Sequence, residues 1–329
     1  MSTLEVHRGG TLTTVQDLGR PGHRAGGVPA SGAMDPFAAA AANLLVGNEP
    51  RAALLEITLR GPVLRFGRAA TIALAGARFL AVLDGRPLPW NRSVAVAAGG
   101  ALEIGDALDG ARAWLAVDGG IAVPEVLGSR STHLRGGFGG HEGRALAAGD
   151  RLPLGPPGDG LPRRLAAPLF APRNGRLEVR ILPGAGEEGF TALARERLTA
   201  AEYRVSPLAD RVGLRLSGPP LSHTAGADIP PEGTLPGMVQ VPGGGEPIVF
   251  GPDGPTTGGY AKIATVAAAD LGALAWLRPG DRLRFRRATL GEAREALARR
   301  RAALAVAVEI CSGIEENSRE EGAACTPST

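Results

Sequence analysis

Short apolar runs bounded by glycine and proline constrain the fold of this chain most strongly. Strand-forming residues fill segments such as 55–59, 71–74, 79–83 and 113–117, and each is soon followed by glycine, proline or an Asp-Gly turn. The 49 glycines and 27 prolines show no collagen-like period, so we interpret them as turns between short strands. The sequence therefore predicts a mainly β architecture.

Length, charge and apolar content exclude several classes of protein. The 329 residues suffice for two domains, and 44% hydrophobic with 21% charged residues is typical of a soluble globular protein. The net charge of +3 comes from arginines interspersed with acids rather than with aromatic residues, which favours a solvated surface over a nucleic-acid site. No apolar run approaches the roughly 18 residues of a membrane span, and no secretory signal is recognisable. We therefore expect a cytoplasmic protein.

Local capping signals place three helices. Asp35 followed by Pro36 predicts a helix over residues 36–46. A second helix is expected around residues 187–202. The capping box from Thr289 to Glu292 begins a third helix that should run to about residue 308.

An internal echo divides the chain in two. Leu-Glu-Val occurs at 4–6 and again at 177–179, and Gly-Asp-Arg-Leu occurs at 149–152 and again at 280–283. Each half would then open on one strand and close on another, which predicts a duplication. We divide the chain into a first subdomain, a Pro- and Gly-rich linker, a second subdomain and an acidic disordered tail, at residues 1–156, 157–176, 177–308 and 309–329.

A glycine-rich stretch at residues 251–265 is the candidate for the chemistry. It lies between the strand-like runs 247–250 and 263–266, which predicts a loop between buried segments. Backbone amides at a glycine pair can approach a ligand closely and hold an oxyanion. The stretch also offers hydroxyls, a phenol and the only lysine of the chain, Lys262. The alternative is a tight surface turn.

Sharper catalytic signatures are missing from the sequence. It contains no phosphate-binding G-x-x-x-x-G-K-[ST], no G-x-S-x-G elbow and no H-E-x-x-H, and its histidines and cysteines lack metal-ligand spacing. Ser31 could act as a nucleophile, but a turn serine is the alternative that its sequence context favours. The remaining donors and acids suit a small polar ligand bearing a carbonyl or carboxylate, with acyl or carboxyl transfer as the chemistry.

Several long motifs resemble a known family. They include Thr-Val-Gln-Asp-Leu-Gly-Arg-Pro-Gly at 14–22, Val-Pro-Ala-Ser-Gly-Ala-Met-Asp at 28–35, Leu-Gly-Ser-Arg-Ser-Thr-His-Leu-Arg at 127–135 and Thr-Thr-Gly-Gly-Tyr-Ala-Lys-Ile-Ala at 256–264. The sequence is identified as a member of the biotin-dependent carboxyltransferase family. That family includes the C subunit of 5-oxoprolinase, KipA-like proteins, allophanate hydrolase subunit 2 and the carboxyltransferase domain of urea amidolyase. The resemblance covers roughly residues 4–288.

The resemblance implies a fold and three alternative functions. The fold would be two tandem cyclophilin-like β-barrel subdomains with a few short helices. As the C subunit of an ATP-dependent 5-oxoprolinase, the chain would open the lactam of 5-oxoproline to L-glutamate with two partners, a KipI-like (allophanate hydrolase subunit 1) protein and a LamB/YcsF-like protein. Alternatively it would transfer carboxyl to urea or a similar amide from biotin supplied in trans. The third alternative is a KipA-like, non-catalytic protein that binds a KipI-like regulator.

The resemblance also suggests roles for individual residues. Lys262 and the amides of the glycine pair would hold the substrate carbonyl, and Arg211 or Arg135 would pair with its carboxylate. Asp210 would orient Arg211 or handle a proton, although an internal Asp210–Arg211 ion pair bridging the subdomains is the alternative. The full candidate set is Lys262, Asp210, Thr257 and Tyr260 for catalysis, and Arg211, Gln240, Thr256, Gly258, Gly259, Arg135, Ser31, Gln16 and Arg20 for substrate binding.

The chain departs from the family pattern at one place. Family members often have Arg-Gln where this chain has Gly254-Pro255. The substitution removes a guanidinium and an amide that could contact a ligand.

Overall fold

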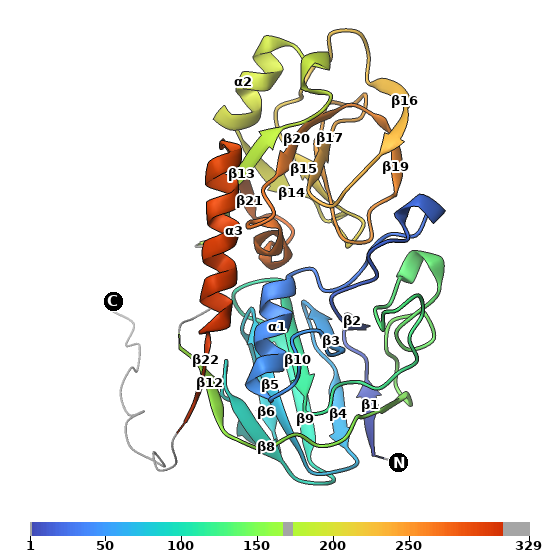
Figure 1. The fold of residues 1–329 in the computed structure, drawn as a ribbon, viewed down its shortest axis with the longest axis vertical. Coiled ribbons are helices and arrows are strands. Elements are labelled where there is room, and N and C mark those ends of the chain that lie inside the picture. The colour runs from blue at the N-terminus through green and yellow to red at the C-terminus, as the bar shows by residue number, and fades with distance from the viewer. Residues whose placement is uncertain (1, 167–173, 312–329) are drawn as a thin grey trace, which may run out of the picture.

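The computed structural model describes residues 2–166 and 174–311, and these form two β-rich halves stacked end to end (Figure 1). The first half runs from strand β1 (Thr3–Arg8) to β11 (Arg151–Pro153), and the second from β13 (Arg176–Pro183) to β21 (Arg282–Arg287). The mainly β fold is confirmed. No helix within the described ranges is long and apolar enough to span a membrane.

Two antiparallel sheets make up the first half and share one hydrophobic core. The six-stranded sheet has the order β11-β1-β4-β9-β6-β7 and adds β4 (Val63–Phe66), β9 (Ala101–Ala107), β6 (Phe79–Leu83) and β7 (Arg86–Pro87). The five-stranded sheet has the order β2-β3-β10-β5-β8 and consists of β2 (Leu12–Gln16), β3 (Leu54–Thr58), β10 (Arg112–Val117), β5 (Ala70–Gly76) and β8 (Ser93–Val96).

Helix α1 (Pro36–Leu45) covers one face of the five-stranded sheet. It lies against β5 and β10, and both strands are therefore buried along their whole length. The Asp35 carboxylate caps the helix by accepting hydrogen bonds from the amides of Phe37 and Ala38, at 3.0 and 3.2 Å. The helix predicted from Asp35 and Pro36 is confirmed, and it ends one residue before the predicted position.

The second half closes into a seven-stranded barrel. Its strand order is β13-β20-β17-β18-β15-β14-β21, and the additional strands are β20 (Lys262–Val266), β17 (Met238–Gln240), β18 (Ile248–Phe250), β15 (Gly213–Ser217) and β14 (Glu202–Val205). A separate two-stranded ribbon, β16 (Asp228–Gly233) with β19 (Thr257–Tyr260), stands beside the barrel (Figure 1). The glycine pair predicted in a loop therefore belongs to a strand.

The internal echo corresponds to paired strands in both halves. Leu4 of β1 lies opposite Leu152 of β11, and Leu177 of β13 lies opposite Leu283 of β21. The first pair is antiparallel and the second is parallel. The repeated segments thus form paired strands at matching positions in both halves, but the relative direction of the two strands differs between the halves.

Two predicted helices differ in length from the expectation. The segment expected as a helix over 187–202 forms a 3₁₀ turn, η3 (Glu187–Gly189), and then α2 (Ala192–Ala200), which the Thr191 hydroxyl caps. The predicted capping box is present at Thr289, and α3 (Leu290–Ala305) follows it. It ends a few residues before the predicted end.

The predicted linker and tail contribute to a small two-stranded sheet. Within 157–176, β12 (Arg163–Leu165) pairs with β22 (Val308–Ile310), whose last residues belong to the predicted tail. The rest of that tail, residues 312–329, and the linker residues 167–173 lie outside the described residues.

The junction of the halves is built around the helix-capping carboxylate of Asp35. Trp276, at the end of the 3₁₀ helix η4 (Leu271–Trp276), enters the core of the first half and donates to Asp35 at 3.2 Å. Arg300 of α3 donates to both Asp35 oxygens, at 3.1 and 3.0 Å, and stacks over the Phe37 ring at 4.4 Å. One carboxylate therefore ties α1, η4 and α3 together.

Candidate functional site

A cleft of about 670 Å³ lies between the two halves. The first half supplies Arg112 from β10 and Arg135 from the short 3₁₀ helix η2 (Leu134–Gly136), and the second half supplies a turn before β15, the end of β17 and the segment after β18. Both halves must be folded and joined for this cleft to exist. It collects four of the predicted site residues, Arg135, Asp210, Arg211 and Gln240.

Arg211 forms the buried floor of the cleft and is saturated by protein partners. Its Nε and Nη2 donate to Asp253, at 2.7 and 3.2 Å, its Nη1 donates to Glu56 of the first half at 2.5 Å, and its Nη2 also donates to the Gly32 carbonyl at 2.7 Å. The side chains of Arg211, Glu56 and Asp253 are only 3%, 1% and 3% exposed. An ion pair bridging the subdomains is confirmed, but its carboxylates are Glu56 and Asp253 rather than Asp210.

The prediction that Asp210 orients Arg211 is therefore wrong. Asp210 instead caps the turn that follows it, because its Oδ1 accepts from the amides of Val212 and Gly213 at 2.9 and 3.0 Å. Asp210 is itself exposed in the cleft. Its carboxylate thus lies where a ligand or water can reach it.

The carboxylates of Asp253 and Glu56 keep the buried guanidinium of Arg211 protonated. Burial alone would lower the pKa of Arg211, but the charges and hydrogen bonds of Asp253 and Glu56 outweigh burial and raise it. Burial lowers the pKa of the neighbouring Arg112, whose Nε lies 3.9 Å from Glu56. Glu56 also accepts from the Met34 amide at 2.7 Å and from the Trp114 indole at 3.0 Å. All of these hydrogen-bond and ion-pair partners of Glu56 are groups of the protein itself.

The groups left for a ligand are two exposed arginines and one buried amide in the lining of the cleft. Arg135 and Arg215 are exposed, and neither makes an ion pair with any described residue. The side-chain amide of Gln240 likewise makes no hydrogen bond within residues 2–166 and 174–311. Guanidinium groups pair with carboxylates in a bidentate manner, and an amide N–H can donate to a carbonyl oxygen. The cleft is thus suited to a small acid that also carries an amide.

Lys262 lies opposite Gln240 on the neighbouring strand β20 and does not line the cleft. Its side chain is 1% exposed, and Nζ lies 2.9 Å from Glu232 of β16 and donates to the Gly258 carbonyl of β19 at 2.9 Å. A Cβ on Gly258 would lie 3.5 Å from the Gln240 Nε2. The lysine therefore fastens the β16–β19 ribbon next to the Gln240 amide.

The remaining predicted residues of the second half lie outside the cleft lining. Thr257 and Tyr260 are exposed on β19, and Gly259 of the same strand approaches the Ile229 carbonyl. Thr256 accepts from the Thr234 amide through its carbonyl at 3.0 Å. These contacts are those of a strand in a ribbon.

Three predicted residues of the first half are buried away from the cleft. Gln16 donates to Thr14 at 3.0 Å and to the Thr132 carbonyl at 3.2 Å. Arg20 donates to the carbonyls of Val126 and Ser131 and lies over the Phe138 ring at 5.1 Å. Ser31 lines a second cavity. The cleft does not bring these three residues together with Arg135 and Gln240.

Sequence reasoning identifies neither Asp253 nor Glu56 as a partner of Arg211. A glutamate inside the apolar run Leu-Leu-Glu-Ile is the available signal, because a buried carboxylate requires a partner. His133 is a further residue that the sequence does not single out. Burial lowers its pKa, the positive charges of Arg20, Arg211 and Arg135 lower it further, and Asp253 opposes them.

The sequence model of one family covers most of the chain. The family described as carboxyltransferase domain, subdomain A and B, matches residues 26–287. The chain belongs to this carboxyltransferase family. It is 39% identical over 294 residues to the 5-oxoprolinase C subunit of Escherichia coli, and the match covers 89% of this chain and 94% of that protein.

Two further members of the carboxyltransferase family are much longer proteins. The urea amidolyase of Saccharomyces cerevisiae is 33% identical over 86% of this chain but only 16% of its own length. A crystal structure of the K. lactis urea amidolyase superposes with a TM-score of 0.88 at 32% identity, and covers 92% of this chain and 20% of that chain. The chain thus spans about a fifth or less of these two relatives, and the matched part of the K. lactis protein has the fold described above.

Proposed function

We propose that this chain is the C subunit of an ATP-dependent 5-oxoprolinase, in which it binds 5-oxoproline and helps to open its lactam to L-glutamate. The proposal is supported by the similarity to a protein named as the C subunit of 5-oxoprolinase, which extends over nearly all of both chains. The observation that carries it is the cleft itself, where the unpaired Arg135 and the Gln240 amide face one space. 5-Oxoproline presents one carboxylate and one lactam carbonyl to match them.

In this proposal each cleft residue has one task. Arg135 pairs with the substrate carboxylate, and the Gln240 amide donates to the lactam oxygen as negative charge develops on it. Asp210, the exposed carboxylate of the cleft, accepts a proton from the attacking water and returns it to the lactam nitrogen as the C–N bond breaks. Arg211 is a positioning residue, because its pairs with Glu56 and Asp253 set the distance between the halves.

Lys262 is also assigned a positioning role. Its contacts with Glu232 and Gly258 hold the ribbon against Gln240, so that the amide keeps one orientation. Thr257 and Tyr260 lie on the same ribbon, Thr256 directly precedes it, and all three would reach the substrate only at the outer rim. Gly258 and Gly259 allow the ribbon to pass close to its neighbours.

The residues of this chain do not fit a phosphate-binding loop for ATP. The glycine-rich turn at 184–189 packs onto β20, and a Cβ on Gly184 would lie 2.2 Å from the Lys262 carbonyl oxygen. The turn also lacks the lysine that a phosphate-binding loop places on the phosphates. ATP would therefore activate the lactam oxygen at a site that partner proteins supply, and we propose the KipI-like and LamB/YcsF-like proteins as those partners.

The decisive experiment is glutamate release from 5-oxoproline and ATP by the reconstituted complex. We expect turnover with this chain and both partners, and none when this chain is left out. Turnover that persists without this chain would refute the proposal. A stable complex that forms without turnover would instead favour the KipA-like regulatory role.

A second candidate is carboxyl transfer to urea or a similar amide. It is favoured by the similarity to two urea amidolyases over most of this chain. A cleft of about 670 Å³ can hold a biotin ring brought by another protein, and Gln240 would donate to the ureido oxygen. Carboxylation of urea with a biotin carboxylase and a biotin carrier, and no 5-oxoproline turnover, would support this alternative.

A further inference from the structure

A second cavity, of about 480 Å³, lies at the junction on the other face of the segment that carries Asp253. Phe250 lines both this cavity and the cleft, and Gly251 and Pro252 form part of the wall. Much of the remaining wall comes from the start of α1, from η4 and from Leu297 and Leu304 of α3. The cavity is therefore built by both halves and closed by the C-terminal helix.

Two groups in this otherwise apolar wall can bind a polar ligand. The Ser31 side chain is buried, with 6% of the residue exposed, and its Oγ makes no hydrogen bond to any residue that the structure describes. Arg301 of α3 also lines the cavity, and its exposed guanidinium makes no ion pair within the described ranges. A buried hydroxyl without a partner costs free energy unless something in the cavity bonds to it.

The backbone fixes Ser31 in an unusual conformation. Its φ is 54°, a left-handed value that few residues other than glycine adopt. The Ser31 amide donates to the Pro252 carbonyl of the other half at 3.1 Å. Close packing also holds it, because a Cβ on Gly32 would lie 2.8 Å from the Gly19 nitrogen. The hydroxyl is thus presented to the cavity by a rigid and strained turn.

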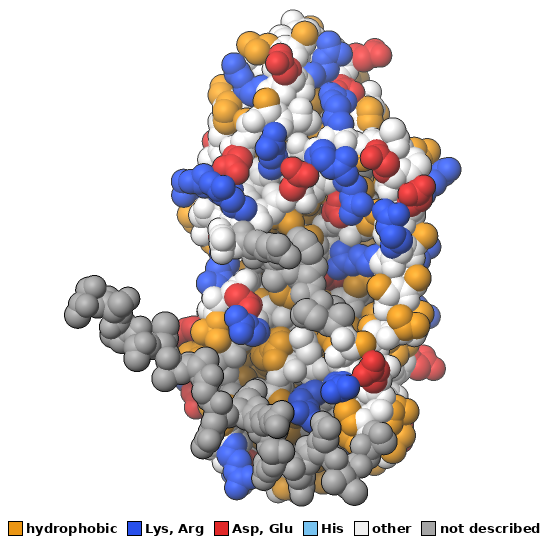
Figure 2. All heavy atoms as spheres, turned by 90° about the vertical axis from the view of Figure 1, so that its left-hand side faces the viewer, with side chains coloured by type: hydrophobic (Ala, Val, Ile, Leu, Met, Phe, Trp, Pro, Cys, Tyr) orange, Lys and Arg blue, Asp and Glu red, His pale blue; other side chains and the backbone are white. Residues whose placement is uncertain are grey.

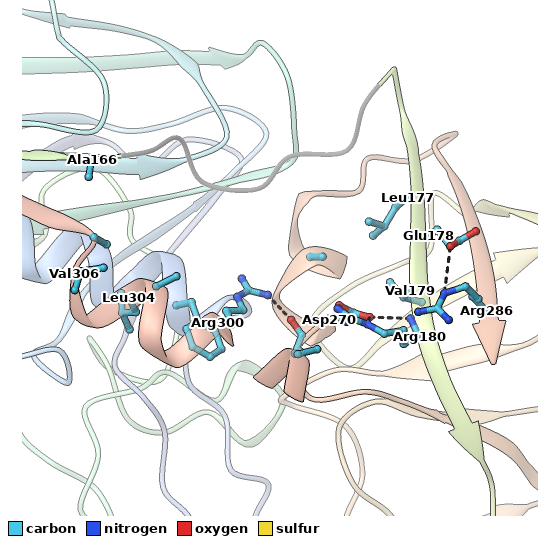
Figure 3. A pocket seen from close by; sticks show the side chains of 16 residues that line it. Ala166, Leu177, Glu178, Val179, Arg180, Asp270, Arg286, Arg300, Leu304 and Val306 are labelled. Carbon is cyan, nitrogen blue, oxygen red and sulfur yellow. Dashed lines mark hydrogen bonds and ion pairs between the residues drawn. The ribbon is translucent and has the colours of Figure 1, made fainter. Parts of the chain in front are cut away.

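A neighbouring cavity shows the contrast. This cavity shares Leu304 of α3 with the one described above. In it, Arg180 pairs with Asp270 at 2.5 Å, Arg286 pairs with Glu178 at 3.6 Å, and Arg300 donates to the Ala269 carbonyl at 2.6 Å (Figure 3). The charged side chains that line that cavity therefore already have hydrogen-bond or ion-pair partners within the protein. Figure 2 shows the outer surface on this side as a mixture of basic, acidic and apolar side chains.

We propose that the cavity beside Ser31 binds a small amphipathic carboxylate that has an internal carbonyl, such as an N-acyl amino acid. The acyl chain fills the apolar interior, the Ser31 hydroxyl donates to the internal carbonyl, and Arg301 pairs with the carboxylate at the rim. The site is separate from the cleft and does not depend on the proposed 5-oxoprolinase activity. A ligand bound there would contact the segment from Phe250 to Pro252, which leads directly into Asp253.

Calorimetric titration of the whole chain with three matched probes tests the proposal. Hexanoylglycine has all three features, nonanoate lacks the internal carbonyl, and hexanoylglycinamide lacks the carboxylate. We expect saturable binding of hexanoylglycine at one site per chain, and roughly tenfold weaker binding of each of the other two. No saturable binding of hexanoylglycine would overturn the proposal.

Variants assign the two contacts. Ser31→Gly removes the hydroxyl and suits the left-handed backbone, so it should fold and weaken hexanoylglycine about tenfold while leaving nonanoate unchanged. Arg301→Gln should weaken hexanoylglycine but not its amide. Arg299→Gln is the control, because Arg299 is exposed on α3 and pairs with Glu295. Equal losses for all probes, or a loss in the control, would contradict the assignment.

A third variant tests the location without touching either contact. Ala268 is exposed and lines the cavity, so Ala268→Phe should narrow the space and leave the fold stable. We expect it to weaken all three probes, and a normal melting temperature shows that the chain is folded. Unchanged binding would place the ligand elsewhere and overturn the proposal.

Discussion

Replacing Arg211 by methionine should destabilise the joined halves more than any surface change. The substitution leaves Glu56 and Asp253 with side chains only 1% and 3% exposed and without their cation. Removing one partner of a buried ion pair costs about 3–5 kcal/mol, because the remaining charge stays buried. For a chain of this size that loss lowers the melting temperature by on the order of 5–10 °C.

Scanning calorimetry and urea unfolding measure this cost. Arg215→Met is the matched control, because Arg215 lines the same cleft but is exposed, and its effect should stay within about 0.5 kcal/mol. In the double variant with Glu56→Gln, the loss should be smaller than the sum of the single losses, since the two side chains interact directly. A loss below about 1 kcal/mol for Arg211→Met, or strict additivity with Glu56→Gln, would refute the reasoning.

Three further predictions concern single residues. Burial lowers the pKa of His133 below its usual 6.5, so the unfolded chain takes up the proton at a higher pH than the folded chain. Stability should therefore fall as the pH drops below 6.5. His133→Gln should flatten this part of a profile of melting temperature against pH. Lys262→Met should reduce glutamate release about a hundredfold. The melting temperature should change little, because the Glu232 side chain is 44% exposed and can turn to water. Unchanged turnover would show that Lys262 does not position Gln240. Gly254→Ala should cost about 1–3 kcal/mol in urea unfolding, because its Cβ would lie 3.0 Å from the Gly251 oxygen, and a neutral result would show that the loop relaxes.

The local parts of the fold could be predicted from the sequence. Asp35 followed by Pro36 specifies α1, and the Thr289–Glu292 capping box specifies α3, because in both cases the deciding contacts lie within one helical turn. Turn residues between apolar runs indicate the β class for the same reason. The long motifs then indicate the family.

The non-local parts could not be predicted from local signals. The Arg211 partners lie 155 and 42 residues away in sequence, so nothing beside Arg211 points to them, and its neighbour Asp210 is the wrong choice. The glycine pair is predicted as a loop because the stretch around it is rich in glycine and proline. Its strand partner, β16, carries two prolines and shows no strand alternation, so the sequence gives no signal for this pairing. Local signals likewise do not show that Gly254 is packed so closely that even a methyl group would press on backbone.

The most direct test of the account is the Michaelis constant for 5-oxoproline in the reconstituted complex carrying Arg135→Gln. If Arg135 holds the substrate carboxylate, KM should rise at least about tenfold, with a smaller change in kcat. Arg151→Gln, a change of an arginine 71% exposed on β11, should leave KM unaltered. Binding of 2-pyrrolidinone, the same lactam without a carboxylate, should be indifferent to Arg135→Gln. An unchanged KM for 5-oxoproline would contradict the assignment of the substrate to this cleft.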